Sequence, residues 1–269
     1  MIAEVEAEAE VEPPSRSGSP PLDPIQLEHW RRHLEQATPV DLLRWTLSRF
    51  GEKAALVTAF QAEGLVLLDM VHRLLPDAEP RVITIDTGRL PQETYDLIDQ
   101  VRERYGVEVE VVFPRAEAVT EMVHRRGVNL FYRSPEDRRA CCQTRKVEPL
   151  GRLLESLDAW ITGLRRQQSS ERAAIEPLEL DETHGGLWKL NPLAHWSWQE
   201  VWDYIELHNV PYHAFYDRGY TTIGCAPCTR AVRPGADPRS GRWWWEEEDV
   251  SKECGLHLSL PVITEGAHP

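Results

Sequence analysis

Short apolar runs alternate with longer stretches of helical periodicity through most of this chain, and this alternation limits its possible folds more than any other feature. Residues 64–75 and 92–105 have the periodicity of helices, and Pro91 precedes the second stretch. Four apolar runs predict strands, and they span residues 54–60, 81–85, 107–113 and 159–162. Strands and helices in this order predict an α/β fold, with an open, mostly parallel twisted sheet and helices on both faces.

The loops after the predicted strands are the expected position of a ligand site. In open parallel sheets, ligands bind beyond the carboxyl ends of the strands. The loops concerned are 58–64, 86–91 and 163–172.

Composition divides the 269 residues into three parts. Residues 1–25 alternate Glu with Val and Ala and then become rich in Pro and Ser, which predicts a disordered acidic tail because such a segment buries too little apolar surface to offset its ordering entropy. Residues 26–235 form the predicted α/β domain. Residues 236–269 follow as a C-terminal segment that contains Cys254.

The charge balance excludes some classes of partner. The chain carries 30 Lys and Arg against 44 Asp and Glu, a formal net charge of −14. A surface that binds duplex nucleic acid needs a net basic face, so no nucleic-acid partner is expected. No apolar run approaches the ~20 residues that span a bilayer, and the N-terminus does not have the pattern of a secretory signal. We therefore expect a soluble, cytoplasmic protein with no membrane partner.

Four of the five cysteines occur as two pairs. An odd total, with no export signal, favours metal binding or thiol chemistry over a disulfide framework. Two residues separate Cys225 from Cys228, a spacing typical of a redox pair, half a zinc site or half an iron–sulfur site. Cys141 and Cys142 are adjacent, so they can ligate one centre only if the backbone between them is contorted, which suits a multi-iron cluster better than one zinc ion. The spacing alone leaves open a cluster, a zinc site, and redox or structural thiols.

The fifth cysteine, Cys254, is isolated near the C-terminus. A lone cysteine is often a small buried hydrophobic residue. Here the flanking residues are polar, Gly255 gives the backbone freedom, and His257 can support a thiolate. We therefore interpret Cys254 as a reactive thiol.

Basic residues near the cysteine motifs predict a site for a phosphate or sulfate group. Arg165 and Arg166 follow a predicted strand, and Arg145 and Lys146 follow the adjacent cysteines. Guanidinium groups match the oxygens of phosphate and sulfate well. Two more, Arg239 and Arg242, precede three consecutive tryptophans at 243–245.

In their order along the chain, these motifs resemble the assimilatory adenylylsulfate reductases, a family shared with the phosphoadenylylsulfate reductases. The resemblance runs from about Ala54 to His257. The matching segments are Asp-Thr-Gly at 86–88, Cys-Cys-Gln-Thr-Arg-Lys-Val-Glu-Pro-Leu at 141–150, Trp-Ile-Thr-Gly-Leu-Arg-Arg at 160–166, Asn-Pro-Leu at 191–193, Asn-Val-Pro-Tyr at 209–212, Gly-Cys-Ala-Pro-Cys-Thr-Arg at 224–230, Gly-Arg-Trp-Trp-Trp at 241–245 and Glu-Cys-Gly-Leu-His at 253–257.

The resemblance implies an adenine-nucleotide α-hydrolase fold and the reduction of adenylylsulfate to sulfite and AMP in sulfate assimilation and cysteine biosynthesis. It implies that Cys141, Cys142, Cys225 and Cys228 hold a [4Fe–4S] cluster, that Cys254 forms an S-sulfonate, and that thioredoxin is the reductant. Lys146 and His257 are further catalytic candidates. The expected substrate-binding residues are Thr58, Asp86, Thr87, Gly88, Arg145, Gly163, Arg165, Arg166, Arg239 and Arg242.

Other interpretations of the sequence remain. Family members of this kind include enzymes that use the 3′-phosphorylated nucleotide or both nucleotides. An adenylating enzyme of the ATP pyrophosphatase type would share the fold, but the loop at 58–64 reads Thr-Ala-Phe-Gln-Ala-Glu-Gly and does not have the Ser and Gly pattern expected there. A non-catalytic iron–sulfur or zinc regulator would need only the paired cysteines. The oligomeric state, including a homo-oligomer, stays open.

Overall fold

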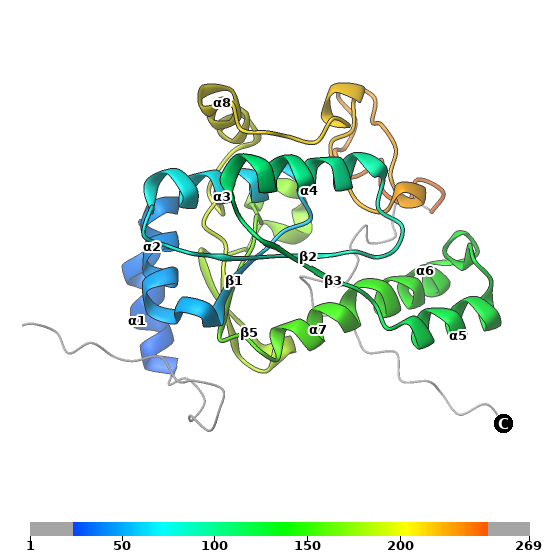
Figure 1. Cartoon of the computed structure of the whole chain (residues 1–269), viewed down its shortest axis with the longest axis horizontal. Coiled ribbons are helices and arrows are strands. Elements are labelled where there is room, and N and C mark those ends of the chain that lie inside the picture. The colour runs from blue at the N-terminus through cyan, green and yellow to red at the C-terminus, as the bar shows by residue number, and fades with distance from the viewer. Residues whose placement is uncertain (1–23, 247–269) are drawn as a thin grey trace, which may run out of the picture.

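The fold is built on a single six-stranded sheet. The structure is a computed structural model that describes residues 24–246 (Figure 1). The strand order is β3-β2-β1-β4-β6-β5, and every neighbouring pair is parallel except β5 with β6. This confirms the predicted mostly parallel sheet. The strands are β1 Ala54–Val57, β2 Arg81–Ile85, β3 Val109–Val112, β4 Ala159–Ile161, β5 Leu178–Asp181 and β6 Leu187–Leu190.

Helices cover both faces of the sheet, as predicted. Figure 1 shows α3 and α4 on one side of the central strands and α5, α6 and α7 on the other. The α-helices are α1 Pro24–Leu34, α2 Pro39–Phe50, α3 Ala62–Leu74, α4 Gln92–Tyr105, α5 Ala116–Arg126, α6 Pro135–Cys142, α7 Glu148–Leu154 and α8 Trp198–His208.

Strand β1 is buried on both faces, because its alternate side chains enter two different cores. Ala54 and Leu56 pack with residues of α2, α3, α4 and α8 in the larger core. Ala55 points the opposite way and packs with Leu150 and Leu154 of α7. Burial on both sides explains why the strand reads as a continuous apolar run rather than an alternating one.

Most predicted elements have nearly the predicted bounds. β2 and α4 agree residue for residue. β1 ends at Val57 instead of Phe60, because Phe60 has a φ of 55° and leaves the extended conformation. β5 and β6 were not predicted.

The structure can be compared with only part of the predicted division into tail, α/β domain and C-terminal segment. α1 begins at Pro24, within the last two residues of the predicted tail, whereas residues 1–23 lie outside the described residues. Of the predicted C-terminal segment, residues 236–246 are described, and Cys254 and His257 are not. Among the helices of residues 24–246, none has the length and apolar character needed to cross a membrane.

Candidate active site

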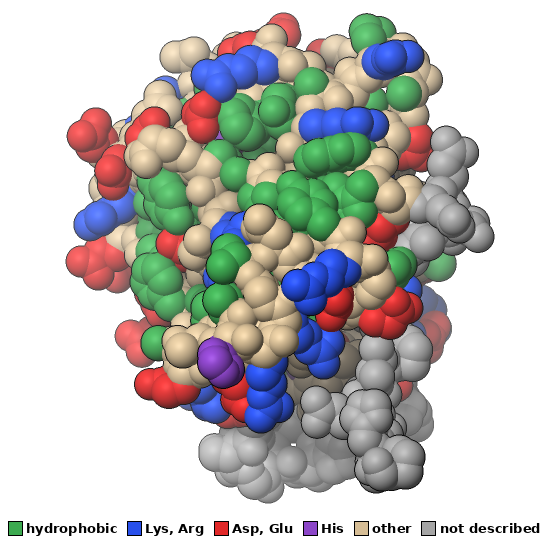
Figure 2. Space-filling model, turned by 90° about the vertical axis from the view of Figure 1, so that its right-hand side faces the viewer, with side chains coloured by type: hydrophobic (Ala, Val, Ile, Leu, Met, Phe, Trp, Pro, Cys, Tyr) green, Lys and Arg blue, Asp and Glu red, His purple; other side chains and the backbone are tan. Residues whose placement is uncertain are grey.

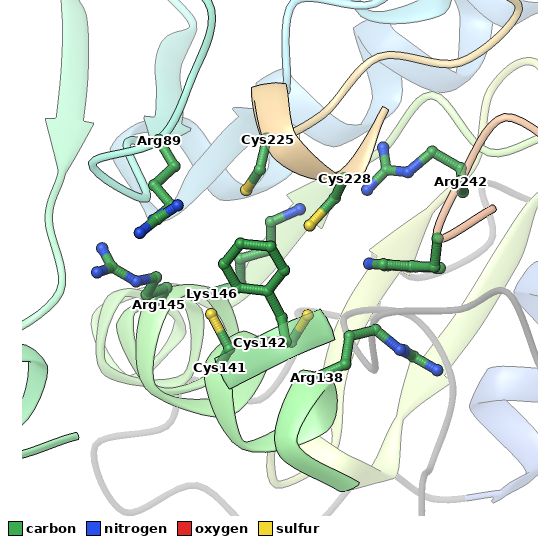
Figure 3. Close-up of a pocket in the computed structure, with 11 residues that line it drawn as sticks. Arg89, Arg138, Cys141, Cys142, Arg145, Lys146, Cys225, Cys228 and Arg242 are labelled. Carbon is green, nitrogen blue, oxygen red and sulfur yellow. The ribbon is translucent and has the colours of Figure 1, made fainter. Parts of the chain in front are cut away.

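Four cysteines from two segments line one small cavity, which we call the cysteine cavity. Cys141 and Cys142 come from the end of α6, and Cys225 and Cys228 come from the loop after α8. In Figure 3 their sulfur atoms face the space between the two segments. All four are free thiols, and all except Cys142 are buried. The structure thus brings the two sequence pairs together.

The backbone around the adjacent cysteines is unusual, but not where the sequence suggested. Cys142 has ordinary helical angles, with φ −64° and ψ −40°, so the peptide link between the two cysteines is not contorted. The irregular part follows at once, as a π-helical turn over Gln143–Val147 that leads into α7. Turns of this kind are rare and often mark functional sites. This one carries Arg145 and Lys146 past the cavity.

Five cationic side chains surround the cysteine cavity. Arg145 donates a 2.6 Å hydrogen bond from Nη1 to the Thr87 carbonyl, and the Thr87 hydroxyl lies 3.2 Å from the Cys225 sulfur. Burial raises the pKa of Cys228 to about 11, although neighbouring Arg242 and Lys146 oppose that shift. Burial also raises the pKa of Cys141, against the influence of Arg145. The cations that line this cavity are Arg89, Arg138, Arg145, Lys146 and Arg242.

Four cysteines around one cavity are a donor set that an iron–sulfur cluster can use. Within residues 24–246, no group of three or more His, Cys, Asp or Glu side chains is placed to hold a metal ion. A multi-iron cluster takes one thiolate on each iron, so it needs four sulfurs distributed around one cavity. Thiols with a raised pKa are protonated near neutral pH, and ligation then requires loss of those protons. The surrounding cations lower the cost of that accumulated negative charge.

A second cavity of about 440 Å³ adjoins the first, and we call it the large cavity. Its volume lies within the ~300–1,000 Å³ typical of small-molecule sites. It opens at the carboxyl ends of β1, β2 and β4, and residues of all three predicted loops line it. A cavity of ligand size therefore lies at the place where the sequence predicts the ligand site.

Close backbone approaches shape the wall of the large cavity at the start of α3. A Cβ atom on Gly163 would lie 2.8 Å from the Glu63 Cβ and 3.2 Å from the Gly64 nitrogen. A Cβ atom on Gly64 would overlap the Thr58 hydroxyl. Only glycine lets the loop after β4 and the loop after β1 approach this closely. The helix N-terminus beside them is a natural place for an anion.

A buried ion pair borders the same cavity. Glu63 Oε1 accepts hydrogen bonds of 2.9 Å from Arg165 Nε and from Gln168 Nε2. Arg172 Nη1 donates to Gln168 Oε1 at 2.6 Å, and the Arg165 guanidinium lies 5.4 Å from the centre of a Trp198 ring. The Glu63 carboxylate thus fixes the Arg165 guanidinium. Gln168 links the same carboxylate to Arg172.

Sequence reasoning missed three members of this network, namely Glu63, Gln168 and Arg172, all of which line the large cavity. Two of them lie within the loop 163–172 that had been singled out, so that loop was the available signal. Glu63 lies in the loop 58–64, which had also been singled out, but its residue type gave no sign of burial, because an acidic residue at the start of a helix is ordinarily exposed.

Three residues line both cavities and so form a shared wall: Lys146, Arg242 and Trp243. Lys146 comes from the π-helical turn after the adjacent cysteines, and Arg242 from the segment that forms an antiparallel bridge with Thr229. Figure 3 shows both cationic side chains beside the sulfurs. A group in the cysteine cavity would therefore lie next to the cations that face the large cavity.

Most predicted substrate-binding residues reach the large cavity. Those that line it are Thr58, Thr87, Gly163, Arg165, Arg239 and Arg242, together with Lys146. Arg145 instead lines the cysteine cavity, and Asp86, Gly88 and Arg166 line neither. Cys254 and His257 lie outside the described residues.

Asp86 and Gly88 serve the loop between β2 and α4. The Asp86 carboxylate accepts hydrogen bonds from the Gly88 N–H at 2.7 Å and from the Tyr95 hydroxyl at 3.0 Å. Burial raises the pKa of Tyr95 to about 12, and the adjacent carboxylate adds to the shift. These bonds hold the loop that places Thr87 in the wall of the large cavity and its hydroxyl beside the Cys225 sulfur.

Arg166 points away from the cavity. Its Nε donates to the Ile175 carbonyl at 2.6 Å, and its Nη2 lies 3.3 Å from the Glu176 carboxylate. Two consecutive arginines after a strand project in different directions, so only Arg165 reaches the large cavity.

Charge on the surface beside the cysteine segments is mixed. Figure 2 shows basic, acidic and hydrophobic side chains interspersed over the described part of this face, without a continuous basic stripe. The arrangement agrees with the net charge of −14.

Comparison with known proteins places this geometry in a family. The family model for the phosphoadenosine phosphosulfate reductase domain matches residues 53–231. An adenosine 5′-phosphosulfate reductase from Burkholderia cepacia is 46% identical over 229 residues, which cover 84% of this chain and 90% of that protein. Adenosine 5′-phosphosulfate reductase 2 from Bacillus subtilis is 42% identical over 219 residues, or 81% of this chain and 89% of that protein.

A solved structure agrees with these sequence matches. The phosphoadenylyl-sulfate reductase of Candida auris, in a phosphate complex, superposes with a TM-score of 0.67 at 31% identity, over 80% of this chain and all of that chain. Since the family model covers more than half of the chain and the relatives cover most of it, the chain is an oxidoreductase that belongs to the family of phosphoadenosine phosphosulfate and adenosine 5′-phosphosulfate reductases.

Proposed function

We propose that the chain reduces adenylylsulfate to sulfite and AMP, as a cytoplasmic enzyme of sulfate assimilation, with thioredoxin as its reductant. The observation that carries the proposal is the shared wall, where Lys146 and Arg242 face both a nucleotide-sized cavity and four clustered thiols. The names of the bacterial relatives support the choice of nucleotide.

The large cavity offers both apolar and cationic side chains to this substrate. Val57, Ile85 and Leu150 provide an apolar wall suited to the adenine ring. Lys146, Arg239 and Arg242 provide cations for the phosphosulfate oxygens. These cations would also offset the negative charge that repels an incoming thiolate.

Cys254 is the proposed nucleophile. Its thiolate attacks the sulfur of the sulfate group, a new S–S bond forms, and the S–O bond to the phosphate breaks so that AMP departs. The product is an S-sulfonate on Cys254, and His257 would stabilise the thiolate before the attack. One thiol of reduced thioredoxin then attacks the Cys254 sulfur and releases sulfite, and its second thiol resolves the mixed disulfide. The dithiol thus supplies both electrons.

The four clustered thiols are proposed to hold a [4Fe–4S] cluster whose contribution is electrostatic and involves no change in its oxidation state. Lys146 follows Cys142 by four residues and lines both cavities, so cluster ligation would fix its position. Since a dithiol already supplies two electrons, the reaction needs none from the iron.

The test is an assay of sulfite release by anaerobically purified protein with thioredoxin, using adenylylsulfate and its 3′-phosphorylated form in parallel. We expect faster turnover of adenylylsulfate, bound iron and acid-labile sulfide, and an added SO₃ on the peptide that contains Cys254 before thioredoxin is added. Cys254→Ser should bind the nucleotide and give no adduct. Full activity in an iron-free preparation, or turnover by Cys254→Ser at the wild-type rate, would refute the proposal.

A further inference from the structure

The guanidinium of Arg242 is packed between a tryptophan ring and a glycine backbone. Its Cζ lies 4.8 Å from the centre of a Trp243 ring. A Cβ atom on Gly224 would lie 2.7 Å from that Cζ and would overlap Nη1. Arg242 is only 6% exposed, and its Nε has no hydrogen-bond partner among the described residues. Packing, rather than a hydrogen bond at Nε, therefore determines where this end of the side chain lies.

The tryptophan in this packing is itself tightly fixed. Trp243 is buried and has a φ of 43°, a backbone conformation that residues other than glycine rarely adopt. A second guanidinium, that of Arg138, lies 4.3 Å from its ring. The backbone is attached to the cysteine loop, because the Arg230 N–H donates to the Gly241 carbonyl at 3.0 Å. A strained residue held in this way indicates a functional constraint.

We propose that Gly224 and Trp243 are positioning residues, which together clamp the Arg242 guanidinium in the shared wall and orient it toward the anionic end of the substrate. This rests on the proposed function. A cation fixed before the substrate arrives stabilises developing negative charge without reorganisation. Gly224 precedes Cys225 directly, so the clamp also joins the cysteine loop to the large cavity.

Gly224→Ala is the direct test, because the new methyl group meets the flexible end of a side chain instead of backbone. The guanidinium should move and the fold should not. We expect kcat/KM for sulfite release to fall at least tenfold, with little change in thermal stability. Gly151→Ala in α7 is the matched control, because its Cβ would meet nothing within 4 Å. A Gly224→Ala enzyme within twofold of wild type would overturn the proposal.

A double-mutant cycle shows whether Gly224 acts through Arg242. If it does, Gly224→Ala should cost nothing further in an Arg242→Ala background, since the group that it displaces is already absent. An additive loss would mean that Gly224 acts by another route and would overturn the clamp. Trp243→Phe keeps an aromatic face and should retain more activity than Trp243→Leu. This pair of variants decides the proposal if Gly224→Ala disturbs iron binding.

Equilibrium binding separates this inference from the proposed function. In a Cys254→Ser background, Gly224→Ala should weaken adenylylsulfate binding at least tenfold and AMP binding by much less, since AMP has no sulfate group. Equal effects on the two ligands would contradict an orientation toward the anionic sulfur group. A wild-type protein that reduces neither nucleotide would refute the proposed function alone, because these dissociation constants would still report on the clamp.

Discussion

Arg138 and Glu246 form an ion pair with a distance of 2.7 Å between Nε and Oε1, and their side chains are 1% and 2% exposed. Arg138 lies on α6, three residues before Cys141, whereas Glu246 is the last described residue of the chain. The pair therefore fastens the segment that leads to Cys254, eight residues further on, to the helix that carries the adjacent cysteines.

Loss of the Glu246 charge should be strongly destabilising. Glu246→Gln leaves the Arg138 guanidinium charged and buried without its carboxylate, and breaking such a pair typically costs about 3–5 kcal/mol. We expect a fall of that order in the free energy of unfolding, measured by urea denaturation. The matched control is Glu121→Gln, because the Glu121–Arg125 pair is 60% and 70% exposed, and pairs of that kind contribute about 0–1 kcal/mol. Equal effects of the two substitutions would contradict this account.

Lys146 should be needed for turnover but not for folding. Lys146→Gln removes a cation that faces both cavities, and loss of one preorganised charge-stabilising group typically lowers kcat by about 10²–10³-fold. Sulfite release measures this loss, and iron content and thermal melting should stay near wild type. Lys53→Gln, at an exposed lysine, is the control and should have no effect on activity. A Lys146→Gln enzyme with normal kcat would remove Lys146 from the mechanism.

The four strands that lie in apolar runs are predicted from the sequence, and the two-stranded hairpin of β5 and β6 is missed. β5 and β6 are four residues each, and they carry Glu179 and Lys189, which form a 3.0 Å ion pair across the two strands. β5 alternates Leu178 and Leu180 with Glu179 and Asp181, and this period of two was an available strand signal. The turn between them contains Gly185 and Gly186, both at positive φ, and this was the available hairpin signal.

Within the site, the paired cysteines and the basic residues could be chosen from spacing, but their directions could not. Arg165 and Arg166 are identical in type and adjacent, yet only Arg165 reaches the large cavity. Arg165 is held beside the cavity because its Nε donates a hydrogen bond to the buried Glu63 carboxylate. That carboxylate is buried because Gly163 packs against the start of α3. The contact between Glu63 and Arg165 joins two loops about a hundred residues apart, so no short sequence motif predicts it.

Glu63 should therefore matter for nucleotide binding through Arg165. Glu63→Ala leaves the buried Arg165 guanidinium without its carboxylate, and we expect at least a tenfold weaker binding of adenylylsulfate in the Cys254→Ser background, measured by calorimetry. Glu63→Gln keeps a hydrogen-bond acceptor and should recover part of the affinity. Arg166→Ala is the control, because this neighbouring arginine does not line the cavity. A larger loss in Arg166→Ala than in Glu63→Ala would reverse the assignment.

His213 makes the stability of the fold sensitive to acid. Its Nδ1 accepts a hydrogen bond from the Phe215 N–H, and its Nε2 lies 3.0 Å from the Thr94 hydroxyl, so the buried ring is neutral. Burial lowers the pKa of His213 below its ordinary value of 6.5, with Arg218 adding to the shift and Glu93 opposing it. The unfolded chain then binds the proton more readily, so the free energy of unfolding should fall as the pH drops below about 6.5. Melting temperatures between pH 8 and pH 5 measure this, and His213→Gln should flatten the decline. A variant that loses stability with pH as steeply as wild type would assign the dependence to other groups.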